Sequence, residues 1–109
     1  MIFTKDDFET FRKINNKLNS IAAIFYSNVF ESNIGEANVQ SISTDKDTFT
    51  ITYSVHGWKI KDGSLDDWKS QFTFYMYINL DLFNDNDELG KFINKEVERV
   101  VNRIELDEN

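Results

Sequence analysis

Three features of the chain indicate an α+β domain in the order α-β-β-β-α, with a three-stranded antiparallel meander and two terminal helices packed on one face. Apolar residues recur at steps of three and four near both ends, which is the period of an amphipathic helix. Between these regions, apolar and polar residues alternate, which is typical of half-buried strands. The 109 residues contain no proline, so long elements can run uninterrupted.

The first helix is expected over residues 5–31, where one apolar stripe runs along its length. Thr4 is placed to cap its N-terminus, and Asp6 and Asp7 lie near the positive end of the helix dipole. Residues 21–30 are apolar on nearly all sides, which predicts burial under a second helix or in a homodimer. The stripe comprises Phe8, Phe11, Ile14, Leu18, Ile21, Ala22, Phe25 and Val29.

Three strands are expected between the helices. His56-Gly57 interrupts the alternation of the middle strand and predicts a bulge, and Asp62-Gly63 is a favoured hairpin pair. In the last strand the apolar row, from Phe72 to Leu80, points to one face, and Tyr75 and Tyr77 point to the other. The strands are predicted at residues 37–44, at 49–60 with the bulge inside it, and at 68–80.

A second helix is expected over residues 87–105, because the segment 84–87 supplies capping residues and the apolar period then returns to about 3.6. The first helix and the last strand each come to about 40 Å, so the domain should be elongated. The buried face of the second helix is predicted to hold Leu89, Phe92, Ile93, Val97, Val100, Val101 and Ile104.

The acidity of the chain is local. Ten of its nineteen carboxylates lie in three segments without Lys or Arg, and removing these ten from the formal net charge of −7 leaves +3 for the remainder. The topology predicts segments 62–67 and 105–108 at one end of the domain and segment 81–88 at the other. The basic residues expected around the waist are Arg12, Lys13, Lys17, Lys91, Lys95 and Arg99. The acids are Asp62, Asp66 and Asp67; Asp81, Asp85, Asp87 and Glu88; and Glu105, Asp107 and Glu108.

Two interpretations of these acids stay open. Asp is favoured in turns and in the first turn of a helix, so segment 81–88 is partly explained by capping. Segment 105–108 fits a solvated tail at the end of a helix. Asp66 and Asp67 exceed what a turn requires, which favours a binding role for segment 62–67.

No catalytic residue, cofactor or metal site is expected. The chain has no cysteine and one histidine, His56, and the spacing of segment 81–90 fails the requirements of a calcium loop. The net charge of −7 disfavours direct binding to nucleic acid. We expect a single domain over residues 1–109. A cytoplasmic location is expected because the N-terminus does not have the pattern of a signal peptide.

The leading hypothesis is a non-enzymatic acidic inhibitor or binding protein that engages a basic, nucleic-acid-binding surface of another protein by mimicking nucleic acid. Small phage inhibitors such as anti-CRISPR proteins, and immunity proteins, act in this way, and the analogy concerns size and charge alone. The alternative is a structural or oligomerising subunit that uses its apolar and tyrosine surface, with a homodimer through residues 21–30. The predicted partner-binding residues are Asp62, Asp66, Asp67, Asp81, Asp85, Asp87, Glu88, Tyr75 and Tyr77.

Overall fold

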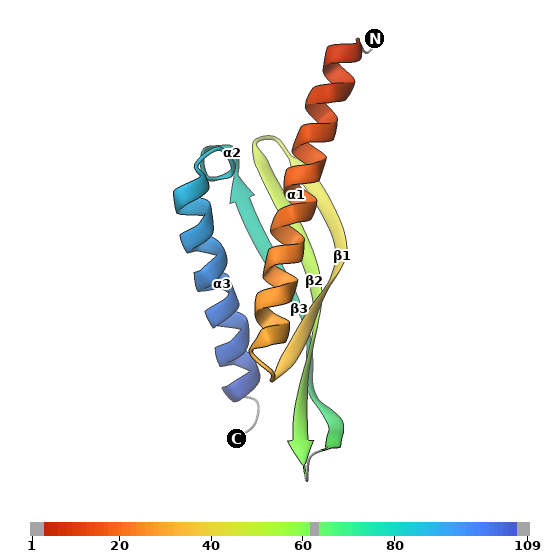
Figure 1. Cartoon of the computed structure of the whole chain (residues 1–109), viewed down its shortest axis with the longest axis vertical. Helices are drawn as coiled ribbons and strands as arrows, with labels where there is room; N and C mark the ends of the chain where they lie inside the picture. Colours follow the sequence, from red (N-terminus) through yellow and green to blue (C-terminus); the bar gives the residue numbers. More distant parts are fainter. Residues whose placement is uncertain (1–3, 62–63, 107–109) are drawn as a thin grey trace.

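The structure confirms the α-β-β-β-α order and the antiparallel meander (Figure 1). The computed structural model describes residues 4–61 and 64–106, and for residues 59–61 and 64–70 it describes the backbone alone. The domain is elongated, with extents of 58 × 25 × 21 Å. Its elements are α1 (Lys5–Glu31), β1 (Gly35–Asp45), β2 (Thr48–Lys61), β3 (Ser64–Asn79), α2 (Leu80–Phe83) and α3 (Asn86–Leu106).

The ends of α1 follow from local chemistry. Thr4 forms the predicted cap as part of a capping box: its hydroxyl accepts from the amide of Asp7, and its own amide donates to the Asp7 carboxylate. These hydrogen bonds lower the pKa of Asp7. After Ser32 the chain leaves the helix at Asn33, whose φ of 64° is left-handed. Asparagine tolerates this conformation better than most residues, so α1 ends there.

The core lies between the sheet and the two long helices. The Tyr53 ring of β2 is fully buried and packs 4.5 Å from the Phe25 ring of α1, and Phe25 stacks on Phe74 at 5.7 Å. Alternate residues of β2 and β3 face this core, as the period of two predicted. The buried sheet residues include Ala37, Phe49, Ile51, Tyr53, Val55, Phe74, Met76 and Ile78.

Two strand pairs contain irregularities, and one of them was predicted. The β2–β3 register shifts on both sides of Trp58, directly after His56-Gly57, which confirms the bulge in that region. The β1–β2 register also shifts between Val39 and Ser41. Lys61 pairs with Ser64, so two residues connect β2 to β3. The predicted turn pair at 62–63 itself lies outside the described residues.

The short helix α2 was not predicted. The apolar row of β3 was expected to end at Leu80, but Leu80 begins α2 and its side chain is exposed. Asn79 provides the reason, because its side-chain oxygen accepts from the amide of Leu82 at 2.8 Å and caps the new helix. The amide of Leu80 donates to the carbonyl oxygen of Asp47 at 2.8 Å, which attaches α2 to the β1–β2 turn.

The N-terminal part of α1 extends beyond the sheet (Figure 1). Phe8 and Phe11 are 64% and 69% exposed, and Ile14 is the first residue of the α1 stripe that packs on the core. The stripe is therefore buried over only part of its length. Arg12 and Lys13, which we expected at the waist, lie on this extension instead. We call residues Lys5–Lys13 the α1 overhang.

Candidate protein-binding surface

One face of the sheet is left uncovered, because α1 and α3 both pack on the other face (Figure 1). The register places short polar side chains of the three strands on this open face, and no Lys or Arg side chain lies on it among the residues described with side chains. The open face comprises Glu36, Asn38, Ser41, Ser43 and Asp45 of β1, Thr48, Thr50, Thr52, Ser54 and His56 of β2, and Gln71, Thr73, Tyr75, Tyr77 and Asn79 of β3.

Tyr75 and Tyr77 lie on this open face, as predicted. They are 50% and 59% exposed, and their rings are nearly parallel at 15° with centroids 6.3 Å apart. On β2, Thr52 lies opposite Tyr75 and Thr50 opposite Tyr77. Threonine beside an aromatic ring is a favourable cross-strand pair. The two rings thus form an aromatic platform on the open face, which we call the tyrosine platform.

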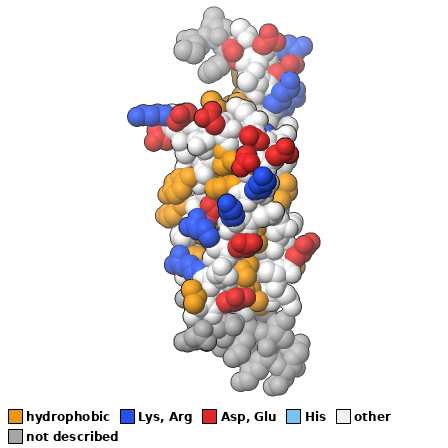
Figure 2. Space-filling view, turned by 90° about the vertical axis from the view of Figure 1, so that its left-hand side faces the viewer, with side chains coloured by type: hydrophobic (Ala, Val, Ile, Leu, Met, Phe, Trp, Pro, Cys, Tyr) orange, Lys and Arg blue, Asp and Glu red, His pale blue; other side chains and the backbone are white. Residues whose placement is uncertain are grey.

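The acidic segment 81–88 lies at the end of the sheet where α2 and the β1–β2 turn meet. Asp81, Asp85, Asp87 and Glu88 are all exposed there. The hydrogen bond from Leu80 to the carbonyl oxygen of Asp47 joins the β1–β2 turn to this segment, so the turn adds two further exposed acids. Figure 2 shows acidic side chains gathered toward this end of the body, above a middle band that holds several Lys and Arg.

We define the acidic end as Asp45, Asp47, Asp81, Asp85, Asp87 and Glu88. Two of these acids have a local role, which supports the capping interpretation for them: Asp85 accepts from the amide of Glu88 at 3.2 Å, and Glu88 forms an exposed ion pair with Lys91 at 3.3 Å. The other four carboxylates make no hydrogen bond or ion pair within residues 4–61 and 64–106. Asp81 and Asp87 lie in the first turns of α2 and α3, where the helix dipole favours acids, so Asp45 and Asp47 are the acids of this end that no helix terminus explains.

The tyrosine platform and the acidic end are neighbours on the open face. Asp45 pairs with Thr48, which pairs with Asn79, and these three residues form the last row of the sheet. Tyr77 is two residues before Asn79 on β3, so it lies in the next row, about 7 Å from the last row, and β2 separates it from Asp45 on β1. The sequence placed the tyrosines on a face and the acids at an end, but only the register brings Asp45 and Tyr77 together.

Segment 62–67 belongs to the opposite end of the sheet, as the topology predicted (Figure 1). Asp62 lies outside the described residues. Asp66 and Asp67 belong to the backbone of β3, and their side chains lie outside the described part of the structure. At the same end, Glu105 is exposed in the last turn of α3, whereas Asp107 and Glu108 lie outside the described range. The binding role of segment 62–67 stays a prediction.

The segment 21–30 is buried more on one side than the sequence suggested. Phe25 and Val29 are fully buried, but Ile24 and Phe30 are about half exposed. Phe30 packs edge-on against Trp58 at 5.6 Å. Ile24 lines an open groove of about 260 Å³ between α1 and α3, opposite Gly90. A homodimer through this segment stays a prediction.

A charged group inside the α3 interface was missed by sequence reasoning. Glu96 is 6% exposed, and its carboxylate accepts from Arg99 at 2.6 Å. The guanidinium of Arg99 lies 5.2 Å from the centre of the Phe74 ring, and that of Arg103 lies 3.8 Å from Phe72. Burial raises the pKa of Glu96, and Arg99 partly opposes this. The signal was present in the sequence, because Glu96 falls between apolar residues at helical spacing.

We also considered metal-binding groups, the single histidine and buried hydroxyl groups as candidate sites. Within the residues that the structure describes, no three His, Cys, Asp or Glu residues are grouped to hold a metal ion. His56 is half-buried on β2, with Nε2 3.0 Å from the Ser54 hydroxyl. The Tyr53 hydroxyl is buried and has no hydrogen-bond partner among the described residues, and burial raises its pKa.

None of the described helices combines the length and apolar character needed to cross a bilayer. Comparison with protein-family models, with curated proteins and with solved structures finds no match for this chain. Its function is therefore inferred from the geometry of the chain itself.

Proposed function

We propose that this chain is a non-enzymatic binding protein that engages a basic surface of another protein through the tyrosine platform and the acidic end together. One observation carries the proposal: the half-exposed, parallel rings of Tyr75 and Tyr77 lie on an uncovered sheet face, one row from Asp45. Tyrosine is enriched in protein interfaces because it offers a large rigid surface with few rotatable bonds.

The surrounding face suits a protein partner. Its neighbours are Ser, Thr, Asn and Gln, whose side chains form hydrogen bonds without a large desolvation cost. A partner's Arg stacked on Tyr77 would gain about 0.5–1 kcal/mol from the cation–π interaction at such an exposed site. Asp45 lies one row further on and two strands away, about 12 Å from Tyr77, so a second basic side chain of the partner would pair with its carboxylate. A basic partner therefore gains from both features at once.

The narrower form of the proposal is nucleic-acid mimicry. Asp45, Asp47, Asp81 and Asp87 could take the place of phosphates in the binding site of a nucleic-acid-binding protein, because each is exposed and makes no hydrogen bond or ion pair within residues 4–61 and 64–106. The supporting observation is that Asp45, Asp47 and Asp81 come from different elements joined by one backbone hydrogen bond. Their arrangement is therefore held by the fold.

Affinity capture from the native host tests the proposal. The wild-type chain should retain a protein with a basic surface, and titration of the purified partner should give an affinity that falls between low salt and about 0.5 M salt, where screening extends only a few Å. The variant Asp45→Asn/Asp47→Asn/Asp81→Asn should bind at least about tenfold more weakly. Tyr75→Ser/Tyr77→Ser should lose a similar factor at either salt concentration.

A matched control distinguishes the effect of the position of the acids on affinity from the effect of the net charge. Glu31→Gln/Glu98→Gln/Glu105→Gln removes the same three charges from exposed positions away from the acidic end, so it should bind within about twofold of wild type. If both triple variants lose affinity equally, only net charge matters and the defined surface is wrong. A partner that binds unchanged after both the tyrosine and the acid substitutions would also refute the proposal.

A further inference from the structure

The outer edge of β3 carries a row of backbone groups that the domain leaves unpaired. The strand order β1-β2-β3 makes β3 an edge strand, so the amide and carbonyl groups of alternate residues point away from β2. Over residues 71–78, none of these outward groups makes a hydrogen bond within the part of the chain that the structure describes. The edge can therefore accept a further strand.

The two edges of the sheet differ in their protection against such pairing. The β1 edge is interrupted by the register shift between Val39 and Ser41, and a bulge of this kind blunts an edge. The β2–β3 register has no shift from Ser70 to Asn79, and residues 71–78 include no Pro and no charged residue. Native proteins commonly protect exposed edges with such residues or with bulges. The β3 edge has neither protection over these eight residues, which span about 26 Å.

Two arginines of α3 lie beside this edge, on the helix-covered side of the sheet. The guanidinium of Arg99 stacks on Phe74 of β3 and that of Arg103 on Phe72, and both arginines are exposed. They lie about 180° and 140° round α3 from Gly90, which lines the groove with α1, so they are on the outer side of the helix. Figure 2, which views this side of the domain, shows basic side chains next to hydrophobic ones in the middle band.

Both guanidinium groups can bind a further acid. Arg103 makes no ion pair with any side chain that the structure describes. Arg99 uses one of its terminal nitrogens for Glu96, and a guanidinium has five N–H donors in total. The β3 edge is therefore bordered by two cations on the helix-covered side and by the tyrosine platform on the open face.

The spacing of the two cations matches the repeat of a strand. Arg99 and Arg103 are four residues apart, which is about 6 Å along a helix axis, and alternate residues of a strand are about 6.6 Å apart. Each arginine accordingly contacts one of two alternate residues of β3. In a strand added to this edge, acidic residues at positions i and i+2 would place one carboxylate beside each guanidinium.

We propose that the outer edge of β3, over residues 71–78, binds an extended segment of another protein that carries acidic side chains at positions i and i+2. The segment would form a fourth strand, with its backbone paired to β3 and its two acids paired to Arg99 and Arg103. Its intervening side chains would lie on the open face beside Tyr75 and Tyr77. The inference does not depend on the proposed function, because it rests on the β3 backbone and two arginines, not on the tyrosine side chains or the acidic end.

Charge argues against a second copy as the added strand. If residues 71–78 paired antiparallel with the same segment of a second copy, the two-fold axis would pass near residues 74–75. The two Arg99 groups, which stack on Phe74, would then come close together on the same side of the joined sheet. Like charges oppose such a contact, whereas an acidic segment is attracted.

A synthetic peptide with this pattern tests the inference. The capped, fluorescently labelled peptide Thr-Val-Glu-Val-Glu-Val-Thr should show saturable binding below about 1 mM in fluorescence anisotropy. Replacing both of its glutamates by lysine should weaken binding at least about tenfold. N-methylation of two consecutive central residues removes an amide donor from each edge of the peptide and should abolish binding. Failure of the first peptide to bind, or equal binding of all three, would overturn the inference.

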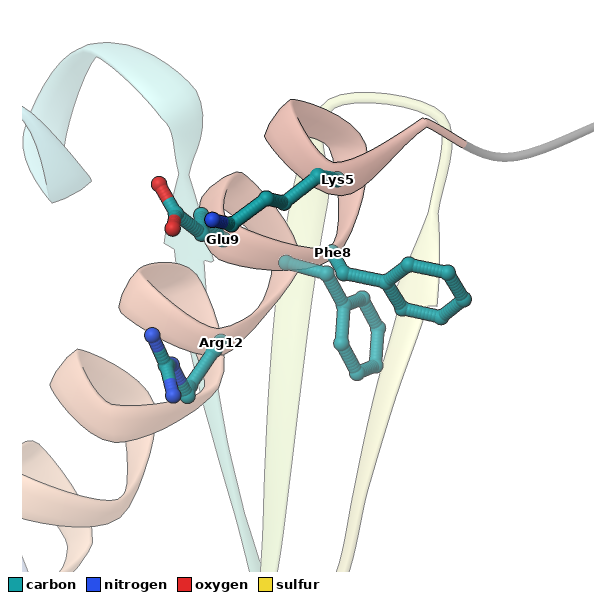
Figure 3. Close-up of a pocket in the computed structure, with 5 residues that line it drawn as sticks. Lys5, Phe8, Glu9 and Arg12 are labelled. Atoms are coloured by element: carbon teal, nitrogen blue, oxygen red, sulfur yellow. The ribbon is translucent and has the colours of Figure 1, made fainter.

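A charge reversal tests the role of the arginines. Arg103→Glu should weaken the glutamate peptide at least about tenfold, and a peptide with one glutamate replaced by lysine should bind this variant more tightly than it binds wild type. Arg12→Glu is the matched control, because Arg12 lines an open hollow of about 650 Å³ on the α1 overhang (Figure 3). It lies about 20 Å along α1 from Phe25, which stacks on Phe74, so the affinity should stay within about twofold. Equal effects of the two reversals would contradict the proposed site.

Amide hydrogen exchange measured by NMR locates the bound peptide. Saturating peptide should slow the exchange of alternate amides within residues 71–78 at least about tenfold, because these amides become hydrogen-bonded, and it should leave the amides of β1 unchanged. Slowed exchange along β1 instead of β3 would place the peptide at the wrong edge and overturn the inference. Sedimentation equilibrium of the free chain should show a monomer, and a dimer that the peptide dissociates would show that a second copy occupies the edge.

Discussion

Lys17 of α1 donates a hydrogen bond of 2.5 Å to the carbonyl oxygen of Phe83, and its ammonium lies 4.6 Å from the centre of the Phe83 ring. The same ammonium donates to the side-chain oxygen of Asn86 at 3.0 Å. Phe83 ends α2 and Asn86 begins α3, and the four last carbonyl groups of a helix have no partner within it. Lys17 therefore joins α1 to the α2–α3 corner that carries part of the acidic end.

Replacing Lys17 by Met should lower the free energy of unfolding by about 1–2 kcal/mol. The variant keeps most of the aliphatic chain but loses one charged hydrogen bond to a part-buried carbonyl and the cation–π contact. Chemical denaturation monitored by tryptophan fluorescence provides the measurement. Lys13→Met, on the exposed overhang, is the control and should change stability by less than about 0.5 kcal/mol. Equal effects of the two substitutions would show that the corner contact contributes nothing specific.

Two glycines should respond to alanine in opposite directions. A Cβ at Gly35 would lie 2.7 Å from Cδ1 of Ile104 and 2.8 Å from the carbonyl oxygen of His56, so Gly35→Ala should destabilise the domain by about 1–3 kcal/mol. A Cβ at Gly90 would meet nothing within 4 Å. Gly90→Ala should therefore stabilise α3 by about 0.5–1 kcal/mol, because alanine loses less backbone entropy in a helix.

Thermal unfolding of both glycine variants measures the difference. If Gly35→Ala unfolds at the same temperature as wild type, β1 does not approach α3 as closely at Gly35 as the structure shows. Gly90→Ala also serves as the control, since it makes the same chemical change where space is open. A loss of stability in Gly90→Ala would mean that the groove between α1 and α3 is closed in solution.

Glu96 should make the stability of the domain depend on pH. Burial raises its folded pKa above the ordinary value of about 4.3, so the folded state binds the proton more tightly than the unfolded chain. The contribution of Glu96 to stability should therefore fall as pH rises from about 4.3 through the raised folded pKa, and it should recover on acidification. The ion pair with Arg99 limits the cost of the charged form at neutral pH.

Comparison of Glu96→Gln with wild type isolates this effect. Near neutral pH, Glu96→Gln should unfold with a free energy equal to that of wild type or higher by up to about 1 kcal/mol, because it removes a buried charge. The difference should disappear as pH falls, since wild-type Glu96 then becomes neutral. Glu98→Gln, which is exposed on the same helix, should show no such pH dependence. A Glu96→Gln advantage that grows on acidification would mean that the folded pKa of Glu96 is lowered, not raised.

Sequence patterns predicted the positions of some residues correctly and failed for others. The alternation from Phe49 to Val55 placed Tyr53 in the core, and the capping residue Thr4 placed the start of α1 correctly. Leu80 was assigned to a strand because it continues an apolar row, whereas the side chain of Asn79 caps a helix there. An apolar period cannot report such a local hydrogen bond. Phe8 and Phe11 also matched the buried period but lie beyond the end of the sheet.

The sequence by itself determined the order of the elements and the side of each one that faces the core. It also determined that Tyr75 and Tyr77 lie on the other side of their strand, and that segments 62–67 and 81–88 belong to opposite ends. These properties depend on neighbours a few residues apart or on the reversal of direction at each turn. Tertiary structure alone decided that Asp45 lies one row from Tyr77, that Asp47 joins the acidic end, and that the α1 overhang stays unburied. Each of these depends on strand register or on where one element ends relative to another, which no short-range pattern encodes.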